Sequence, residues 1–327
     1  MRIITAGAVA NDHLMSFPGK FADQFLADSL EHVSLNFLVD DLQVHAGGTG
    51  ANVAYAAGQL GAGPVLLASV GADFDSGQRA FLEAHGVNTR HVRVSATRHT
   101  ARFVCTTDAT GAQIGSFYPG AMTEAADVTL APVVEALGGC DAVIVSPDDP
   151  GAMLAHADEC RAAGWPLWAD PGQTSARFGG EDLARFLTGA TYVFSNAYER
   201  ELIERKTGWS PDDALARVGA WIVTRGVEGS EIHRRGEEVV RVDVVPVAHA
   251  ADPTGAGDAF RGGFAAAHGW GLGDERCAQV GAAIASLSVE SVGPQEYTAS
   301  VDSVLGRVRA TYGDAAADEI AAAAGLA

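Results

Sequence analysis

An alternation of short buried strands and helices, which begins near Pro132, constrains the fold of this chain more than any other feature. Apolar runs such as Ala142–Ser146, Pro166–Asp170 and Tyr192–Asn196 alternate with longer segments of helical character such as Pro150–Ala163. Strands that alternate with helices are typically parallel and are covered by helices on both faces. The order therefore predicts a three-layer α/β/α domain with a mostly parallel central sheet.

The remaining elements extend this pattern and add a second, smaller one. The main layer also includes a first strand at Ile3–Thr5, helices at Glu181–Thr188, Ala197–Arg205 and Pro211–Val218, a strand at Trp221–Thr224 and a final helix at Ala315–Ala327. Three strand-like segments do not belong to this alternation of strands and helices: Val33–Val39, Thr100–Thr107 and Gln113–Tyr118. We therefore expect one domain of 327 residues with a small inserted β-sheet, drawn from about residues 12–44 and 98–120.

The charge balance and the cysteines exclude several functions. The chain has 41 acidic and 22 basic residues, a net charge of -19, which disfavours nucleic acid and anionic membranes as partners. No signal peptide or membrane-spanning run of about 20 apolar residues is found, so a cytoplasmic enzyme is expected. The four cysteines lack C-x-x-C spacing and are predicted to be free, buried or half-buried thiols.

The segment Asp252-Pro-Thr-Gly-Ala-Gly-Asp258 carries the strongest chemical signal. Its glycines allow a tight turn, and the helix expected to begin near Asp258 presents unpaired N–H groups and a positive dipole end. The amides of Ala256 and Gly257 could stabilise charge on a transferring phosphoryl group, and Asp258 could act as a general base. By itself the segment fits equally well with a helix cap after a glycine turn.

A second glycine-rich segment, Gly47–Gly61, begins with two adjacent glycines and places Asn52 near the start of a helix. Close backbone approach and an amide side chain suit the binding of a polyhydroxyl substrate. Taken alone, the segment is more typical of small residues that let a helix pack closely.

Together the two segments, in this order and about two hundred residues apart, resemble the signatures of the ribokinase-like PfkB carbohydrate kinases. Within that family the chain is most similar to the bacterial adenosine kinases of the actinobacterial type. That likeness rests on Asp12–Met15, Val33–Leu35, Phe37–Leu42, His99–Phe103, Ser116–Met122, Ala169–Pro171, Lys206–Trp209 and Asp252–Gly255. The resemblance implies a ribokinase-like fold and an ATP-dependent kinase of purine salvage. Its small sheet is expected to form a lid over the substrate.

The resemblance also assigns roles to individual residues. Asp258 would be the catalytic base, with Gly255, Ala256 and Gly257 as the anion hole. The nucleoside would be bound by Asp12, Asn36, Gly48, Asn52, Phe103, Phe117, Gln173 and Arg177. ATP would contact Asn196, Thr224, Gly226, Gly229 and Gly257. Glu199 would hold Mg²⁺ through water, and Asp252 would help to hold K⁺.

Simpler structural roles remain open for several of these residues. Asn196 could cap the following helix, Phe103 and Phe117 could be core residues of the small sheet, and Arg177 could be a solvated surface residue. Ala8, Asn36 and Thr174 depart from the adenosine kinase pattern on the substrate side. The leading interpretation is a kinase forming a nucleoside 5'-monophosphate, with adenosine as the favoured acceptor. A ribokinase- or fructokinase-like sugar kinase and a non-catalytic binding protein are the alternatives.

The aromatic and β-branched content of the small sheet also predicts a homodimer, because an exposed unpaired sheet invites aggregation. No G-x-G-x-x-G follows the first strand, which argues against a Rossmann dehydrogenase. The ten histidines show no H-E-x-x-H pattern, which argues against a metallohydrolase.

Overall fold

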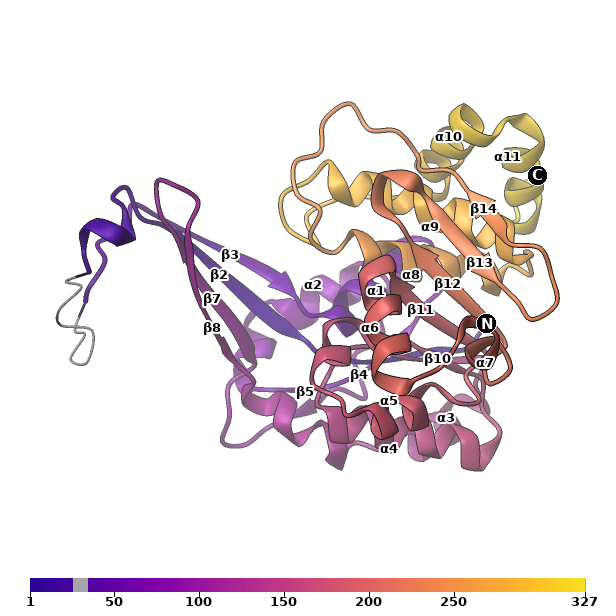
Figure 1. Ribbon diagram of the computed structural model, residues 1–327, viewed down its shortest axis with the longest axis horizontal. Helices are drawn as coiled ribbons and strands as arrows, with labels where there is room; N and C mark the ends of the chain where they lie inside the picture. Colours follow the sequence, from indigo (N-terminus) through magenta and orange to yellow (C-terminus); the bar gives the residue numbers. More distant parts are fainter. Residues whose placement is uncertain (26–34, 327) are drawn as a thin grey trace.

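The protein is described by a computed structural model that covers residues 1–25 and 35–326. Its core is an eight-stranded sheet in the order β14-β13-β12-β11-β10-β9-β1-β4 (Figure 1). Neighbouring strands from β4 to β12 are parallel, and β13 and β14 continue the sheet in antiparallel fashion. The strands are β1 (Ile3–Ala6), β4 (Val65–Leu67), β9 (Ala142–Val145), β10 (Leu167–Ala169), β11 (Tyr192–Asn196), β12 (Ala220–Thr224), β13 (Ser230–His233) and β14 (Val240–Val242).

Helices cover both faces of this sheet, which confirms the predicted three-layer architecture. One face packs against α1 (Thr49–Gln59), α2 (Gln78–Ala84), α8 (Ala256–Gly269), α9 (Asp274–Val289), α10 (Val301–Tyr312) and α11 (Asp314–Ala323). The other packs against α3 (Ala131–Leu137), α4 (Pro150–Ala163), α5 (Gly180–Leu187), α6 (Ala197–Thr207) and α7 (Pro211–Leu215). Successive strand residues alternate between the two cores, so Ile144 enters one and Val143 the other.

Local sequence signals account for the helix boundaries. The Asp149 side chain accepts hydrogen bonds from the Gly151 and Ala152 amides, Pro150 occupies the first turn of α4, and Gly164 ends the helix in a left-handed conformation. Side-chain capping and a C-terminal glycine satisfy backbone groups that a helix leaves unpaired. The position of α4 was therefore predictable from its own residues.

A separate four-stranded sheet extends away from the main body (Figure 1). Its order is β3-β2-β7-β8, formed by β2 (Ala10–Ser16), β3 (Asp41–Gly47), β7 (Ala101–Thr107) and β8 (Gln113–Tyr118). β2 and β7 are parallel, and the outer pairs are antiparallel. A two-stranded pair, β5 (Ser69–Val70) and β6 (Arg93–Val94), lies in the connection between α1 and β7.

One predicted strand is wrong. Of Val33–Val39, residues 33 and 34 lie outside the described part of the chain, and residues 35–39 form no strand. Phe37 instead packs against Phe17 and Phe21, with ring centroids 5.1 and 4.9 Å apart. The alternating apolar residues there serve a local aromatic cluster, and the pairing strand begins later, at Asp41.

Two further expectations concern the described residues. Cys105, Cys160 and Cys277 are buried and Cys140 is half-buried, and all four are free, as predicted. Within the described ranges, the helices are too short or too polar to cross a membrane.

The close contact between α1 and α8 requires a glycine at position 262. A Cβ atom on Gly262 of α8 would stand 2.5 Å from the Ala56 Cβ and 2.6 Å from the Val53 carbonyl oxygen. Gly262→Ala should therefore lower the free energy of unfolding by about 1–3 kcal/mol. Gly306 of α10 has open space around it, so Gly306→Ala is the matched control and should stabilise by about 0.5–1 kcal/mol. Urea denaturation measures both, and equal effects would contradict the predicted close packing.

Candidate active site

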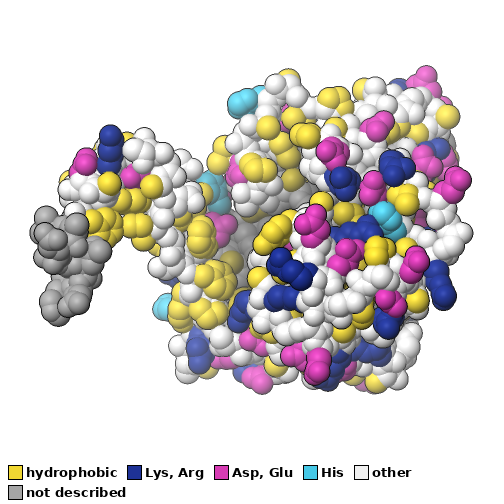
Figure 2. Space-filling model, viewed as in Figure 1, with side chains coloured by type: hydrophobic (Ala, Val, Ile, Leu, Met, Phe, Trp, Pro, Cys, Tyr) yellow, Lys and Arg dark blue, Asp and Glu magenta, His cyan; other side chains and the backbone are white. Residues whose placement is uncertain are grey.

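A cavity of about 940 Å³ lies between the small sheet and the carboxyl ends of the central strands. In Figure 2 the surface is hollowed between the protruding sheet and the body, and hydrophobic side chains border the hollow. The carboxyl ends of parallel strands are where open α/β sheets bind their ligands. Almost all predicted site residues line the cavity, namely Asp12, Gly48, Asn52, Phe103, Phe117, Gln173, Arg177, Asn196, Glu199, Thr224, Gly226, Gly229, Gly255, Ala256, Gly257 and Asp258.

Asp258 lies in the first turn of α8. The turn before it requires a glycine at position 255, where φ is +79° and a Cβ atom would stand 2.4 Å from the Pro294 Cβ. The Ala256 N–H donates to the Pro253 carbonyl at 3.2 Å, whereas Gly257 has no backbone acceptor among the described residues. Of the two amides predicted for an anion hole, Gly257 is therefore the one that remains available to a ligand.

A chain of amides holds the Asp258 carboxylate from α1. Asn52 Nδ2 donates to Asp258 Oδ2 at 2.8 Å, and Gln295 Nε2 donates to Asn52 Oδ1 at 2.8 Å. The second contact fixes the orientation of the Asn52 amide, so its donor side faces the carboxylate. Burial raises the pKa of Asp258, while Arg261 and Asn52 act in the opposite direction. One carboxylate oxygen is thus oriented, and the other faces the cavity without a partner among the described residues.

The small sheet contributes a row of side chains to the opposite wall. Asp12 of β2 is in register with His45 of β3 and Phe103 of β7, and Phe103 is in register with Phe117 of β8. Partners in register point to the same face of a sheet. Burial raises the pKa of Asp12, and the neighbouring His45 opposes this shift. Phe117 remains 52% exposed, so its ring is available to a ligand rather than packed as core.

Gln173 and Arg177 lie on the connection that follows β10, and a lysine outside the cavity fixes this connection. Lys206 Nζ donates to the carbonyls of Ser175, Ala176 and Phe178 at 2.9, 2.7 and 2.8 Å. Three charge-assisted hydrogen bonds hold the short 3-10 helix that leads to Arg177. Ala8 and Thr174, two of the positions that depart from the adenosine kinase pattern, also line the cavity.

Asn36 and Asp252 are the predicted site residues that do not line the cavity. Asn36 is exposed on the irregular segment before β3, where the Phe37 cluster directs the chain, so its prediction as a substrate ligand is not supported by its position. Asp252 accepts from the Thr254 amide at 2.9 Å and the Gly293 amide at 3.1 Å. Burial alone would raise the pKa of Asp252, but these hydrogen bonds lower it on balance.

On the other side of the cavity, Asn196 and Glu199 form a reciprocal capping box at the start of α6. The Asn196 side chain accepts from the Glu199 amide, and Glu199 Oε2 accepts from the Asn196 amide, both at 2.8 Å. The capping role considered for Asn196 is therefore real, and it coexists with a place on the cavity wall. The second oxygen of Glu199 has no hydrogen-bond partner among the described residues, so it is available to a ligand.

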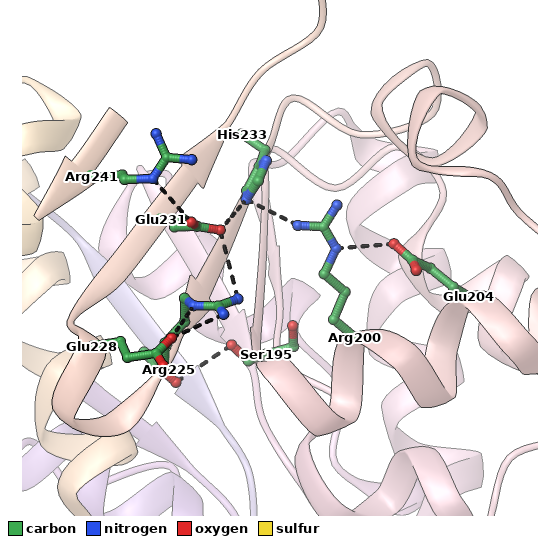
Figure 3. A network of polar contacts seen from close by, with 9 residues as sticks. Ser195, Arg200, Glu204, Arg225, Glu228, Glu231, His233 and Arg241 are labelled. Carbon is green, nitrogen blue, oxygen red and sulfur yellow. Dashed lines mark hydrogen bonds and ion pairs between the residues drawn. The ribbon is translucent and has the colours of Figure 1, made fainter. Parts of the chain in front are cut away.

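A polar network fixes the neighbouring turn, which carries Gly226 and Gly229 (Figure 3). Arg225 Nε donates to Glu228 at 3.0 Å across the turn, and Arg225 also lies 3.9 Å from Glu231 of β13. Glu231 lies 3.1 Å from His233, which in turn contacts Arg200 of α6 at 2.9 Å. Arg241 and Glu204 extend the network at either end. The network connects the helix of Glu199 to the turn predicted to contact ATP.

Sequence reasoning assigned no role to three charged residues of the cavity. Arg261 follows Asp258 by one helical turn, a spacing that places both on one face of α8. Asp148 and Asp170 follow β9 and β10 at the ligand-binding end of the sheet. Strand-end position was the available signal, but it did not distinguish these residues from their neighbours.

The charge of the cavity bears on what it can bind. Among the described residues, its lining includes five acidic side chains and two basic ones, Arg177 and Arg261. A polyphosphate would meet net repulsion here unless cations accompany it. No group of three or more His, Cys, Asp or Glu side chains is arranged to hold a metal ion within the described ranges.

Comparison with known proteins decides the family. The profile of the pfkB family carbohydrate kinases matches residues 16–300. The chain belongs to this family. As a pfkB kinase it is a phosphotransferase that acts on a nucleoside or sugar hydroxyl, with ATP as the co-substrate.

Several relatives of this pfkB kinase are nucleoside kinases. The chain is 29% identical to the nucleoside kinase of Methanocaldococcus jannaschii over 286 residues, 87% of this chain and 92% of the relative. It is 31% identical to that of Methanothermobacter thermautotrophicus over 271 residues, 82% and 85% of the two chains. The Burkholderia thailandensis nucleoside kinase in complex with inosine superposes with a TM-score of 0.83 at 32% identity, covering 96% and 99%.

Asp148 makes the stability of this pfkB kinase depend on pH. Its carboxyl is 5% exposed and accepts only the Asp149 amide, at 2.7 Å, among the described residues. Burial raises its pKa to about 7, far above the value of about 3.9 in an unfolded chain. The native state therefore keeps a proton that the unfolded state loses, and stability falls as the pH rises from about 4 through 7.

Asp148→Asn removes that ionisation. The variant should be more stable than the parent at about pH 8, by on the order of 1–4 kcal/mol, and should lose this advantage near pH 5. Chemical denaturation across this pH range measures the difference. Glu237→Gln, at an exposed position, is the control and should leave the pH dependence unchanged. A constant difference between Asp148→Asn and the parent at every pH would contradict the prediction.

Proposed function

We propose that this chain transfers the γ-phosphoryl group of ATP to the 5'-hydroxyl of a purine nucleoside, with adenosine as the acceptor favoured by its sequence. The observation that carries the proposal is the place of Asp258. Asp258 lies at the start of α8, and Asn52 of α1 orients its carboxyl. On one side of it the small sheet presents Asp12, and on the other lies the wall formed by Asn196, Glu199 and Thr224. A base is useful only where an acceptor hydroxyl and a phosphate donor meet.

In this proposal the free oxygen of Asp258 takes the proton of the hydroxyl as it attacks phosphorus. The Gly257 amide and the amino end of α8 stabilise the charge on the transferring group. Asn52 uses one N–H for Asp258 and keeps the other for a sugar hydroxyl, which the Asp12 carboxylate and the close approach of Gly48 complement. These contacts would bind a ribose diol from two sides and position the 5'-hydroxyl.

The aromatic row argues for a base attached to that sugar. Phe103 and Phe117 present rings to the cavity from adjacent strands, and aromatic rings stack on purines. Gln173 offers an amide and Arg177 a guanidinium from the opposite connection. A free sugar would leave this apolar wall unused. The relatives named nucleoside kinases, one of them solved with inosine, support the same acceptor class.

Cations are the second requirement of the proposal. The excess of carboxylates supplies hard oxygen ligands of the kind Mg²⁺ prefers. The described residues form no ready-made cage, which fits an ion that arrives with ATP and keeps its waters. The free oxygen of Glu199 would hold it through water. Mg²⁺ would neutralise the phosphates against the acidic cavity. Asp252, whose charge is favoured by two amide hydrogen bonds, is proposed to balance a K⁺ ion near the turn before α8.

An ATP-consumption screen over nucleosides and sugars tests the acceptor, and Asp258→Asn tests the base. Adenosine or inosine should be phosphorylated far better than ribose or fructose. Asp258→Asn should lower kcat by about 10²–10⁴-fold, because it removes the base, and leave the Kd of ATP little changed.

Two outcomes would count against the proposal. Rapid turnover of ribose or fructose with none of any nucleoside would favour a sugar kinase. Full activity of Asp258→Asn would remove its assigned role.

We also propose that the small sheet is a lid and that it pairs between two copies of the chain. Leu42 and Val44 of β3, with Ile114 and Tyr118 of β8, are exposed apolar side chains on its two edge strands. Uncovered edges of this kind favour association. Light scattering at micromolar concentration should give the mass of a dimer. Leu42→Lys together with Val44→Lys should shift it towards the monomer, and a monomeric parent protein would contradict the pairing.

A further inference from the structure

Arg261 and Asp170 form a buried ion pair beneath the predicted base. Arg261 Nε lies 2.7 Å from Asp170 Oδ2, and Arg261 Nη2 donates to Asp170 Oδ1 at 2.9 Å. The two residues are 7% and 1% exposed. A buried ion pair contributes little net stability compared with an apolar pair of the same volume, so stability alone does not explain this one.

Arg261 also contacts the start of α8 at Gly257. Arg261 Nη1 lies 2.7 Å from the point where a Cβ atom of residue 257 would stand, so the guanidinium rests against the Gly257 backbone. The Asp170 carboxylate holds two nitrogens of the guanidinium, and the third is thereby directed towards the turn. Arg261 thus connects the end of β10 to the backbone of Gly257, the residue whose amide is available to a phosphoryl group.

The charged surroundings of Asp258 make this cation important. Glu199 from α6 and Arg261 from α8 act on Asp258. Burial raises the pKa of Asp170 at the end of β10 and of the Tyr297 hydroxyl in the segment before α10, and Asp258 in turn adds to both shifts. Burial and Glu199 raise the pKa of Asp258, whereas Arg261 and the Asn52 hydrogen bond lower it. Arg261 is the cation of this group, and Arg177, the other basic residue of the lining, is exposed on a separate connection.

We propose that Arg261, held by Asp170, is a positioning residue for phosphoryl transfer: it keeps the Asp258 carboxyl ionised and fixes the Gly257 amide. The inference rests on the proposed function of Asp258 as base. Asp170 has the complementary role of restraining Arg261 and moderating its charge: burial raises the pKa of Asp170, and the guanidinium 2.7 Å away opposes that shift and favours the carboxylate. Neither residue is required to touch the acceptor or ATP.

Single substitutions in the pair should move the pH profile in opposite directions. Arg261→Gln removes the cation, so the acidic limb of kcat should move to higher pH, with at least a tenfold loss at about pH 6 relative to about pH 8. Asp170→Asn leaves the guanidinium unneutralised, so the limb should move to lower pH. Arg261→Lys keeps the charge but loses the two-point contact, so the limb should stay near that of the parent while kcat falls. A purely structural pair would not shift the limb with opposite signs.

The double variant Asp170→Asn with Arg261→Gln separates folding from catalysis. It removes both buried charges and leaves two amides that can hydrogen-bond, so its Tm should recover relative to Arg261→Gln. The acidic limb of its kcat profile should nevertheless remain at higher pH than that of the parent. Arg307→Gln is the matched control. It breaks a half-buried ion pair that lies away from Asp258, in which Arg307 Nη2 is 2.6 Å from Glu290 Oε2. That variant should change Tm without moving the limb.

A titration of the Asp258 carboxyl by ¹³C NMR in the ligand-free protein distinguishes failure of this inference from failure of the proposed function. The Asp258 signal is identified by its loss in Asp258→Asn. If the parent phosphorylates no nucleoside, the proposed function fails, while the titration still tests the effect of Arg261. If Asp258 titrates at the same pH in the parent, Arg261→Gln and Asp170→Asn, the inference is overturned.

Discussion

The hydrogen bond between Asn52 and Asp258 joins the two glycine-rich segments of the chain, 206 residues apart. It requires α1 and α8 to pack almost in contact, which small residues such as Gly262 and Ala56 permit. Gln295 completes the arrangement by fixing the Asn52 amide. Because this contact holds α1 and α8 together, the positions of the remaining cavity walls can be described relative to it.

The cavity has a rigidly supported backbone and an excess of negative charge in its lining. Its backbone is held from outside by Lys206, by the capping box of Asn196 and Glu199, and by the network around Glu231. Its lining, however, carries more negative than positive charge. Burial raises the pKa of the lining carboxyl of Asp148, and a polyphosphate would meet net repulsion in the cavity unless cations accompanied it. Rigid support and unfavourable charge together are typical of sites that perform chemistry rather than only fold.

Much of the fold followed from local pattern. Buried runs such as Ala142–Val145 and capped helices such as α4 are determined by their own residues, so the alternation predicted the layers and the parallel strands. The strand expected at residues 33–39 failed because Phe37 serves an aromatic cluster with Phe17 and Phe21. Periodicity cannot distinguish side chains that alternate across a strand from those that gather in a loop.

The sequence by itself determined the glycine turn before α8, the family likeness and a set of predicted site residues, most of which line the cavity, because glycine geometry and helix ends are local properties. Tertiary structure alone decided which groups meet. It paired Arg261 with Asp170, left Asp148 without a cationic partner among the residues the structure describes, and kept Asn36 outside the cavity. Contacts between residues far apart in the chain depend on packing, and the pKa of a buried group depends on everything packed around it. The candidate base and Asn52 were therefore identifiable from the sequence, whereas the contact between them and the role of Arg261 beside them were not.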